Sequence, residues 1–400
     1  MPALSLIEII VRPGNPDFLD FPWHLPLTEW QGSGVILEDL PAGLSRHPVI
    51  FLNVNGQLFA LKELPNGAAQ KEYQALLKLE NQRLPCVQPV GYARTRTQFG
   101  PASVLITRYL EHSLPFLALF TGDRMVSYRA YLLDAIAGLM VQLHLAGIYW
   151  GDCSLSNTLF KRDAGALRAF LVDAETVEIY SSEDVPPALR HQDMDIMEEN
   201  INGDLSDLGA EIYLPNQIYL SSAGSYLRLR YQRLWEEITR EEIINPEEHF
   251  RIQERIRALN ELGFSVGDVE LFNTRNGDQL RLRVMVTDQY FHRDRLQSLT
   301  GIEAGDRQAR RMMNEIFEVK ATLSRDNNRS MPLSVAAHHW LQNIYQPTLE
   351  RLKPLERPGL EAPELYCQLL EHKWYLSEKA QRDVGHPAAC DDYLGSFHSF

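Results

Sequence analysis

The sequence predicts an α+β protein with two lobes, one rich in strands and one mainly helical, followed by a mostly helical C-terminal domain that contains a β-hairpin. Three observations support this fold class. Short apolar runs separated by turn residues dominate the first 110 residues, and helical periodicity dominates residues 128–146. After about residue 220 the pattern changes to further helices and a hairpin. A chain of 400 residues also suggests two to three packed units.

The composition is that of an ordinary globular chain. Hydrophobic residues make up 44% and charged residues 23%, which excludes wholesale disorder. The net charge of −14 argues against a nucleic-acid binder or a protein held on anionic membranes. The four cysteines are far apart and the N-terminus lacks a basic signal-peptide region, so we expect a cytoplasmic protein. The most apolar stretch, 130–150, is interrupted by polar residues and predicts a buried helix rather than a membrane span.

The first lobe is predicted from short strands with turn signals between them. A strand-like run, Leu4–Val11, lies in an N-terminal extension, residues 1–34. Asn55-Gly56 is a strong hairpin signal because a type I′ turn needs positive φ at both central residues. Residues 35–110 are expected to form the lobe and its hinge, with strands at Val35–Leu40, Val49–Val54, Leu58–Lys62 and Val104–Tyr109 and a helix at Ala69–Glu80.

The second lobe, residues 111–220, and the C-terminal domain, residues 221–400, are predicted mainly from helical periodicity. Apolar residues recur at helical spacing over 128–146, and a boundary is expected near 210–225. Asn276-Gly277 predicts a hairpin turn in the C-terminal domain. The elements expected there are helices over 224–241, 247–262, 289–300 and 306–321, and the hairpin strands Val269–Phe272 and Gln279–Val286.

The polar residues that carry chemistry lie in and after a loop that follows the 128–146 helix. The sequence contains no phosphate-binding glycine motif, metalloprotease motif or nucleophile elbow. Instead, Asp152 is followed five residues later by Asn157, and a strand-like run ends at Asp173. Two carboxylates and an amide can hold Mg²⁺ together with phosphate oxygens and can orient an attacking hydroxyl. The alternative is that these residues only form turns and caps.

A second polar pair, Lys62 and Glu72, lies upstream. Lys62 ends an apolar strand, where its side chain either reaches solvent or meets an anion. Glu72 lies on the following helix beside apolar residues, where it can pair with Lys62. The alternative is an ordinary solvated lysine and glutamate. The specific signal is the order Lys, Glu, Asp-x4-Asn, Asp.

This order resembles the protein-kinase-like superfamily. Leu58–Lys62 looks like the V-A-I-K strand, Trp150–Asn157 resembles the H-R-D-x-x-x-x-N loop, and Val172–Glu175 occupies the D-F-G position. The form H-x-x-G-I-x-x-G-D-x-S-x-x-N, which ends at Asn157, is similar to lipopolysaccharide-core (Kdo/heptose) sugar kinases. The whole chain resembles an uncharacterised bacterial family with a kinase-like N-terminal half and a C-terminal domain of unknown function. That wider resemblance is carried by Leu117–Phe120, Trp150–Asn157 and Gln308–Arg311.

The resemblance implies a bilobal protein-kinase-like fold that uses ATP and Mg²⁺. Lys62 would hold the α- and β-phosphates, and Glu72 would orient Lys62. Asp152 would accept or steer the proton of the substrate hydroxyl. Asn157 and Asp173 would ligate Mg²⁺.

Further nucleotide contacts are implied at two places. The segment containing Arg108 and Leu110 falls where a kinase hinge offers backbone groups to adenine. No glycine-rich loop lies between the first two expected strands, and 41–47 occupies its place. There Gly43 permits close backbone approach and Ser45 and Arg46 can contact phosphate, or the segment is a surface turn.

Three departures from the kinase pattern bear on regulation and on the acceptor. Gly151 replaces the H-R-D arginine, Ala174 replaces the D-F-G phenylalanine, and no A-P-E follows. We therefore infer constitutive activity and a non-protein acceptor. Glu80 is a weaker alternative partner for Lys62.

Several other motifs are expected to be structural. Asp193-Met-Asp195 fails as a calcium loop, and an aspartate at the start of this helix is expected to brace the catalytic-loop backbone. Cys153 is expected to be an inert, partly buried thiol. A basic patch over 281–311 either binds an anion or consists of interleaved charge pairs; its arginines are Arg281, Arg283, Arg293, Arg295, Arg307, Arg310 and Arg311.

Three hypotheses for function follow. The first is an Mg²⁺/ATP-dependent phosphotransferase acting on a hydroxyl of an unidentified acceptor. The alternative is a degenerate kinase that binds nucleotide and acts as a regulatory or scaffold protein. In the third, the C-terminal domain dominates as a module for a protein partner, through residues 221–400.

Overall fold

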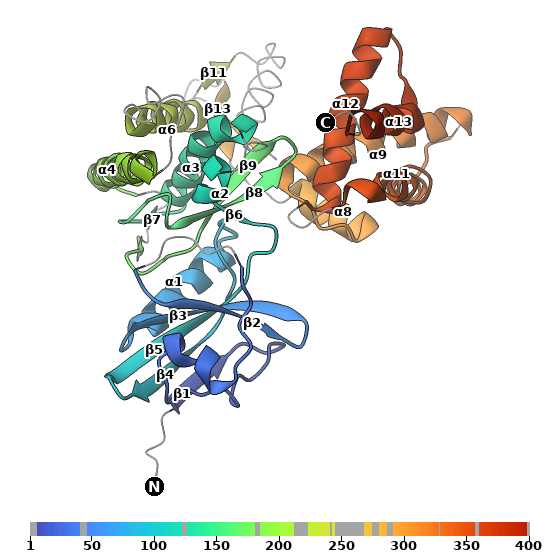
Figure 1. Ribbon diagram of the computed structural model, residues 1–400. Helices are drawn as coiled ribbons and strands as arrows, with labels where there is room; N and C mark the ends of the chain where they lie inside the picture. The colour runs from blue at the N-terminus through green and yellow to red at the C-terminus, as the bar shows by residue number, and fades with distance from the viewer. Residues whose placement is uncertain are drawn as a thin grey trace. The chain divides into compact units, whose positions relative to one another are not determined.

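The computed structural model describes residues 6–40, 46–121, 126–180, 185–211, 223–240, 242–244, 268–273, 280–285, 291–327, 329–356 and 360–397 (Figure 1). The chain forms two compact units. Unit 1 consists of Met1–Lys161 and Leu167–Gln232, and unit 2 consists of Arg162–Ala166 and Arg233–Phe400. Among the described residues, no helix is both long enough and apolar enough to cross a membrane.

The first lobe of unit 1 is a five-stranded antiparallel sheet with one helix. Its strands run in the order β1-β4-β5-β3-β2. They are β1 (Leu6–Val11), β2 (Val49–Val54), β3 (Gln57–Pro65), β4 (Pro89–Thr97) and β5 (Gly100–Arg108). The helix α1 (Ala68–Asn81) packs on β3, β4 and β5. Asn55 and Gly56 both have positive φ, 56° and 79°, which confirms the predicted type I′ hairpin between β2 and β3.

Alternation along β3 gives the sheet two different faces. Phe59 and Leu61 point into an apolar core and are fully buried, so Lys62 points to the opposite face, where α1 packs. The N-terminal residues cover the apolar face through two short 3₁₀ helices, η1 (Leu27–Glu29) and η2 (Gln31–Ser33), and buried aromatic side chains. These aromatics are Phe18, Trp23 and Trp30.

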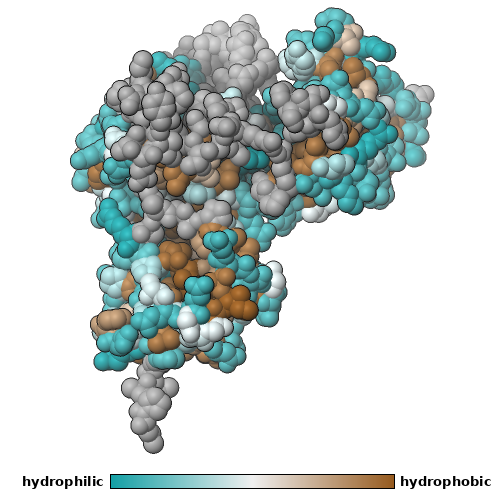
Figure 2. Space-filling view, in the orientation of Figure 1, coloured by the Kyte–Doolittle hydropathy of each residue, from teal (hydrophilic) through white to brown (hydrophobic). Residues whose placement is uncertain are grey.

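The expected strand Val35–Leu40 is wrong. These residues belong to no strand ladder. Glu38 N–H donates to Phe51 O on β2 at 2.9 Å, and Val35 N–H donates to Trp30 O at 3.4 Å. Val35 and Leu37 instead pack against the aromatic core. Their alternation therefore reflects burial of side chains and not strand pairing. The lobe also exposes Ile36 (85%), and Figure 2 shows other apolar residues on its visible face.

The second lobe of unit 1 combines helices with two small sheets. The expected helix over 128–146 is confirmed as α3 (Val126–Leu145), and Gly147, with φ of 74°, follows it. The sheets have the orders β6-β8-β9 and β10-β7. The remaining elements are β6 (Leu114–Pro115), α2 (Phe116–Thr121), β7 (Ile148–Tyr149), β8 (Thr158–Asp163), β9 (Ala166–Leu171), β10 (Glu178–Ile179), α4 (Pro187–Glu211) and the first part of α6 (Ala223–Thr239), whose residues from Arg233 onward belong to unit 2.

Unit 2 is mostly helical, and the two expected hairpin strands pair in it, whereas the Asn276-Gly277 turn lies outside the described residues. β12 (Asp268–Asn273) pairs antiparallel with β13 (Leu280–Met285), and β11 (Glu242–Ile244) adds to the other edge of β13. The helices over 289–300 and 306–321 are confirmed, whereas the helix expected over 247–262 lies outside the described residues. The helical elements are α8 (Phe291–Thr300), α9 (Asp306–Asp326), α10 (Leu333–Trp340), the π-helix η4 (Leu341–Tyr345), α11 (Gln346–Leu352), η5 (Lys353–Leu355), α12 (Ala362–Ala380) and α13 (Gly385–Phe397).

Candidate active site

Three charged side chains from distant parts of unit 1 meet at the centre of the candidate site. Lys62 Nζ, at the end of the apolar run on β3, lies 3.3 and 3.2 Å from the two carboxylate oxygens of Glu72 on α1. It lies 2.5 Å from Asp173 Oδ2, just after β9. Glu72 is fully buried and also accepts a hydrogen bond from Ala174 N–H at 3.2 Å. The Lys62–Glu72 pair expected from the sequence is present, and Glu80 pairs with Arg12 instead, at 2.6 Å.

Two carboxylates share this single lysine, and the pKa values reflect that. Burial alone would lower the pKa of Lys62, but the charges of Glu72 and Asp173 outweigh burial and raise it, so Lys62 is a cation at neutral pH. Burial raises the pKa of Glu72 to about 7, and the nearby carboxylate of Asp173 adds to this shift. Two carboxyl groups thus face one cation, and the raised pKa of Glu72 reflects its burial beside a second carboxylate.

Asp152 is held between two amide groups. Asn157 Nδ2 donates to Asp152 Oδ2 at 3.0 Å, and Asn200 Nδ2 donates to Asp152 Oδ1 at 3.0 Å. Both amides also donate to the loop backbone, at Asp152 O and Cys153 O. The carboxylate is therefore fixed in direction.

One face of α4 braces the whole loop 150–157. The expected backbone brace is confirmed at Asp193, which accepts from Trp150 N–H at 2.8 Å and Gly151 N–H at 2.9 Å. Asp204 accepts from Leu155 N–H at 2.8 Å and from Ser156 N–H at 3.2 Å. Asn200, which lies between Asp193 and Asp204 along α4, donates a hydrogen bond to the Asp152 carboxylate. We missed Asn200 and Asp204 in the sequence, although their spacing from Asp193, seven and eleven residues, places all three on one helical face.

Gly151 explains one departure from the kinase pattern. Its φ is +80°, and an added Cβ would lie 3.0 Å from the Tyr149 ring and 3.2 Å from Thr176 O. A residue with a side chain is strained in this conformation and crowded as well, so an arginine does not fit the loop as it is built. The loop is linked instead to the Asp173 segment, because Trp150 Nε1 donates to Asp173 O at 3.1 Å and Thr176 Oγ1 donates to Trp150 O at 2.7 Å.

His144 supports the brace from inside α3. Its fully buried ring contacts Asp193 Oδ2 through Nε2 at 3.1 Å and the Tyr231 hydroxyl through Nδ1 at 2.7 Å. Because a carboxylate only accepts, Nε2 carries the proton and Nδ1 accepts from Tyr231. Burial lowers the pKa of His144, and the bond to Asp193 offsets this only in part. The imidazole is therefore neutral at pH 7.

The lowered pKa of His144 predicts a loss of stability in acid. The unfolded chain takes up a proton as the pH falls below about 6.5, whereas folded His144 resists protonation, so acid favours the unfolded chain. The contribution of neutral His144 to the free energy of unfolding is complete above that pH. It is lost as the pH falls towards the lowered pKa of His144 in the folded protein. We expect the urea midpoint of wild type to fall between pH 7.5 and 5.5 by more than that of His144→Gln, which has no titrating group. Equal falls in the two proteins would contradict this assignment.

The other predicted nucleotide contacts are only partly described. Gly43 and Ser45 lie outside the described residues, and Arg46 is exposed next to them. In the hinge, Arg108 N–H donates to Gln88 O at 2.9 Å, and the Arg108 guanidinium lies 4.8 Å from the centre of the Phe59 ring. Leu110 N–H has no acceptor among the described residues.

The residues expected to be structural have ordinary partners. Asp195 lies 2.6 Å from Arg228, and Cys153 is fully buried, which raises the pKa of its thiol and makes it inert. In the basic patch, Arg311 lies 3.6 Å from Glu371 and Arg293 lies 3.9 Å from Asp306. The side chains of Arg281 and Arg283 lie outside the described residues.

Asn157 and Asp173 offer oxygen atoms of the kind that Mg²⁺ prefers. The Asn157 amide nitrogen is used by Asp152, and within the described residues no donor approaches the Asn157 side-chain oxygen. No group of three His, Cys, Asp or Glu side chains in the described part of the chain is arranged as a metal site. A cage made only of protein side chains is not needed, because Mg²⁺ is usually held by one or two side chains together with water and substrate phosphates. The donor set thus fits Mg²⁺ delivered with a nucleotide.

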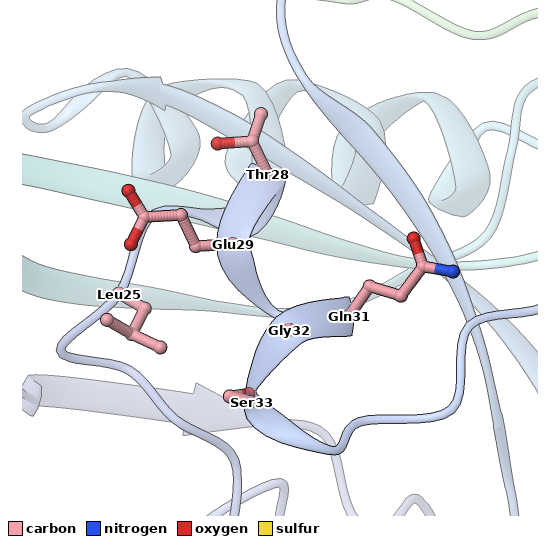
Figure 3. A pocket seen from close by; sticks show the side chains of 6 residues that line it. All are labelled: Leu25, Thr28, Glu29, Gln31, Gly32 and Ser33. Atoms are coloured by element: carbon pink, nitrogen blue, oxygen red, sulfur yellow. The ribbon is translucent and has the colours of Figure 1, made fainter.

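A separate hollow of about 650 Å³ lies along η1 and η2 (Figure 3). Figure 3 shows the side chains of Thr28, Glu29 and Gln31 projecting from this segment. Its lining residues are Leu25, Thr28, Glu29, Gln31, Gly32 and Ser33. None of the candidate site residues lines it, so the hollow is not part of the site.

Comparisons with known proteins agree with the two-part resemblance expected from the sequence. The family model of the lipopolysaccharide kinase (Kdo/WaaP) family matches residues 52–200, which include Lys62, Glu72, Asp152, Asn157 and Asp173. No curated protein matches the chain. The solved structures that match include "WaaP in complex with acyl carrier protein", with 15% identity, a TM-score of 0.33, and coverage of 64% of this chain and 99% of that one. A second family model, the domain of unknown function DUF4032, matches residues 233–397. The two family models therefore match separate parts of the chain, the lipopolysaccharide kinase (Kdo/WaaP) model residues 52–200 and the DUF4032 model residues 233–397.

Proposed function

We propose that the protein is an Mg²⁺/ATP-dependent phosphotransferase that acts on a hydroxyl of a non-protein acceptor. The main observation that supports this proposal is that Lys62 forms ion pairs with both Glu72 and Asp173. A loop fixed by hydrogen bonds also holds Asp152 and Asn157 together. These five residues come from three regions of the sequence, and each has the residue type that phosphoryl transfer needs at its place. The match to a kinase family over residues 52–200 supports the same reaction class.

Each residue has one task in this proposal. Lys62 binds nucleotide phosphates, and buried Glu72 keeps the lysine charged and directed. Asn157 and Asp173 hold Mg²⁺, which when bound neutralises phosphate charge. Asp152 receives the proton of the acceptor hydroxyl on a carboxylate oxygen, and the amides of Asn157 and Asn200 keep that carboxylate in place.

The acceptor class is supported by what the site lacks. With glycine at 151 in a conformation that disfavours any side chain, the usual arginine anchor for a phosphorylated activation loop is missing. Ala174 replaces the phenylalanine whose packing switches many protein kinases. We therefore assign a non-protein acceptor, and the family match makes sugar hydroxyls the first class to test.

The test is turnover of ATP by the purified full-length chain with a panel of sugars, with and without Mg²⁺. Asp173→Ala is expected to lower Mg²⁺-dependent turnover by at least ~100-fold, because a metal contributes several kcal/mol of charge stabilisation. Asp207→Ala, an exposed change on α4, is the control and should leave turnover unchanged. If wild type binds an ATP analogue but transfers no phosphate, and Asp173→Ala changes nothing, the degenerate-kinase hypothesis replaces this one.

A further inference from the structure

The turn between β8 and β9, with the strand ends next to it, belongs to unit 2, although the rest of both strands belongs to unit 1. Arg162–Ala166 group with 233–400 as one compact body. The two central residues, Ala164 and Gly165, have positive φ of 52° and 81°. Ala164 is a residue with a side chain in this costly conformation, and it is 3% exposed, in an apolar cluster with Trp340 and Tyr366. The turn is therefore packed into the core of unit 2 and is not a loose surface loop.

A buried carboxylate on α12 holds the backbone of the turn. Glu364 is 1% exposed, and its Oε2 accepts from Ala164 N–H at 2.7 Å. The same oxygen accepts from the side chain of Gln308 at 2.8 Å. Burying a carboxylate costs free energy unless every lone pair finds a donor, and Gln368 supplies another at 3.2 Å. The network is therefore specific for this turn conformation.

The N-terminus of α9 also forms hydrogen bonds with the residues of the turn. Asp163 accepts from the backbone N–H groups of Arg307 and Gln308, at 3.2 and 3.0 Å, and so caps the helix. Gln308 Nε2 donates in addition to Arg162 O at 3.2 Å. Residue 305 has to be glycine here, because a Cβ at that position would overlap the Asp163 carboxylate. This assigns a role to Gln308, the first residue of a stretch singled out in the sequence.

The strands that leave the turn run directly to the two metal-binding residues. β8 begins at the residue after Asn157, and β9 ends two residues before Asp173. At that far end, Val172 N–H donates to Asn157 O at 3.1 Å and so joins the two strand ends. A strand of six residues is about 20 Å long, so β8 and β9 form a short hairpin. Contacts that fix its turn therefore also restrain the far ends of the two strands.

We propose that the C-terminal domain positions the metal-binding pair by holding the β8–β9 turn, with Glu364 and Gln308 as positioning residues. The proposal rests on the proposed function for the identity of the metal-binding pair. It gives the DUF4032 region a defined task, which is to keep Asn157 and Asp173 at the separation that nucleotide-bound Mg²⁺ requires.

The first test measures positioning without any ligand. In amide hydrogen exchange of the full chain, Glu364→Ala is expected to speed exchange in 157–172 by at least ~10-fold, because the turn loses the acceptor that holds it. Glu364→Gln keeps an oxygen for Ala164 N–H and should restore most of the protection. Leu369→Ala lies on the same helix in a separate apolar cluster, and it controls for general weakening of unit 2. The proposal is overturned if residues 157–172 exchange at the same rate in Glu364→Ala and in wild type. It is also overturned if Leu369→Ala speeds their exchange as much as Glu364→Ala does.

The second test measures the metal. Binding of a fluorescent, non-hydrolysable ATP analogue is titrated with and without Mg²⁺. Glu364→Ala should weaken Mg²⁺-dependent binding by about 10-fold, as loss of a group that orients a metal ligand typically does, and leave metal-free binding unchanged. Unchanged Mg²⁺-dependent binding in this variant overturns the proposal. If wild type shows no Mg²⁺-dependent binding, the proposed function fails, and the exchange comparison alone decides whether the turn positions Asn157 and Asp173.

Discussion

Replacing Asp152 by asparagine is expected to lower the rate of phosphate transfer by roughly 10²–10⁴-fold, which is the range for loss of a positioned proton acceptor. The change keeps the size of the side chain, and its carbonyl oxygen still accepts from Asn157 Nδ2. Asparagine cannot accept a proton at neutral pH, so the loss should fall on kcat. Affinity for Mg²⁺ and nucleotide should stay within about threefold, because in our assignment Asp152 contacts neither.

A matched variant separates chemistry from support of the loop. Asn200→Ala removes one of the two amides that hold Asp152 and leaves the carboxylate itself. We expect a smaller loss in kcat than for Asp152→Asn, with no change in the pH dependence. Steady-state kinetics over a pH series, with nucleotide affinity measured separately, checks both variants. A loss confined to nucleotide affinity in Asp152→Asn would remove Asp152 from the chemical step.

Asp193→Ala is expected to destabilise unit 1 by roughly 3–6 kcal/mol, because it leaves several buried donors without an acceptor. The donors are the backbone N–H groups of Trp150 and Gly151 and the ring N–H of His144. Each unsatisfied buried group costs about 1–3 kcal/mol, and a loss of this size is a large part of the 5–15 kcal/mol typical of a folded domain. Urea unfolding measures the change.

Asp195, two residues along the same helix, is the control for this prediction. Its side chain is 71% exposed and pairs with Arg228, so Asp195→Ala should change stability by less than about 1 kcal/mol. Similar losses in both variants would show that the buried bonds of Asp193 are not what stabilises the loop. The comparison uses two aspartates that look equivalent in the sequence motif Asp193-Met-Asp195.

The sequence was sufficient where a local rule applies. The Asn55-Gly56 turn needs positive φ, and the turn forms as expected. Apolar periodicity predicted α3, and the chain order of Lys62, Glu72, Asp152, Asn157 and Asp173 predicted a group that the fold does bring together as linked pairs. The strand Val35–Leu40 failed, because an alternating pattern reports which side chains are buried and not whether a partner strand lies alongside.

Other parts of the site depended on contacts that no local pattern carries. In the sequence, Asn200 and Asp204 cannot be told from other polar residues of a helix. Their role is visible only in the structure, where α4 packs against the loop and both side chains hydrogen-bond to loop residues. Asp193 and Asp195 differ only in burial, which tertiary packing sets. Gly151 shows its purpose only once its positive φ and its neighbours are known.

By itself, the sequence determined which residues are available for the proposed phosphoryl transfer and in what order, because residue type, spacing and turn propensity are local properties. Only the tertiary structure decided which groups hold those residues in place. It set Lys62 between two carboxylates, assigned α4 to brace the loop, and placed the β8–β9 turn within unit 2. Those outcomes come from packing between segments that are far apart in the chain. Asp193 and Leu155 meet partners 43 and 49 residues away, and 111 residues separate Lys62 from Asp173, distances that no periodicity spans.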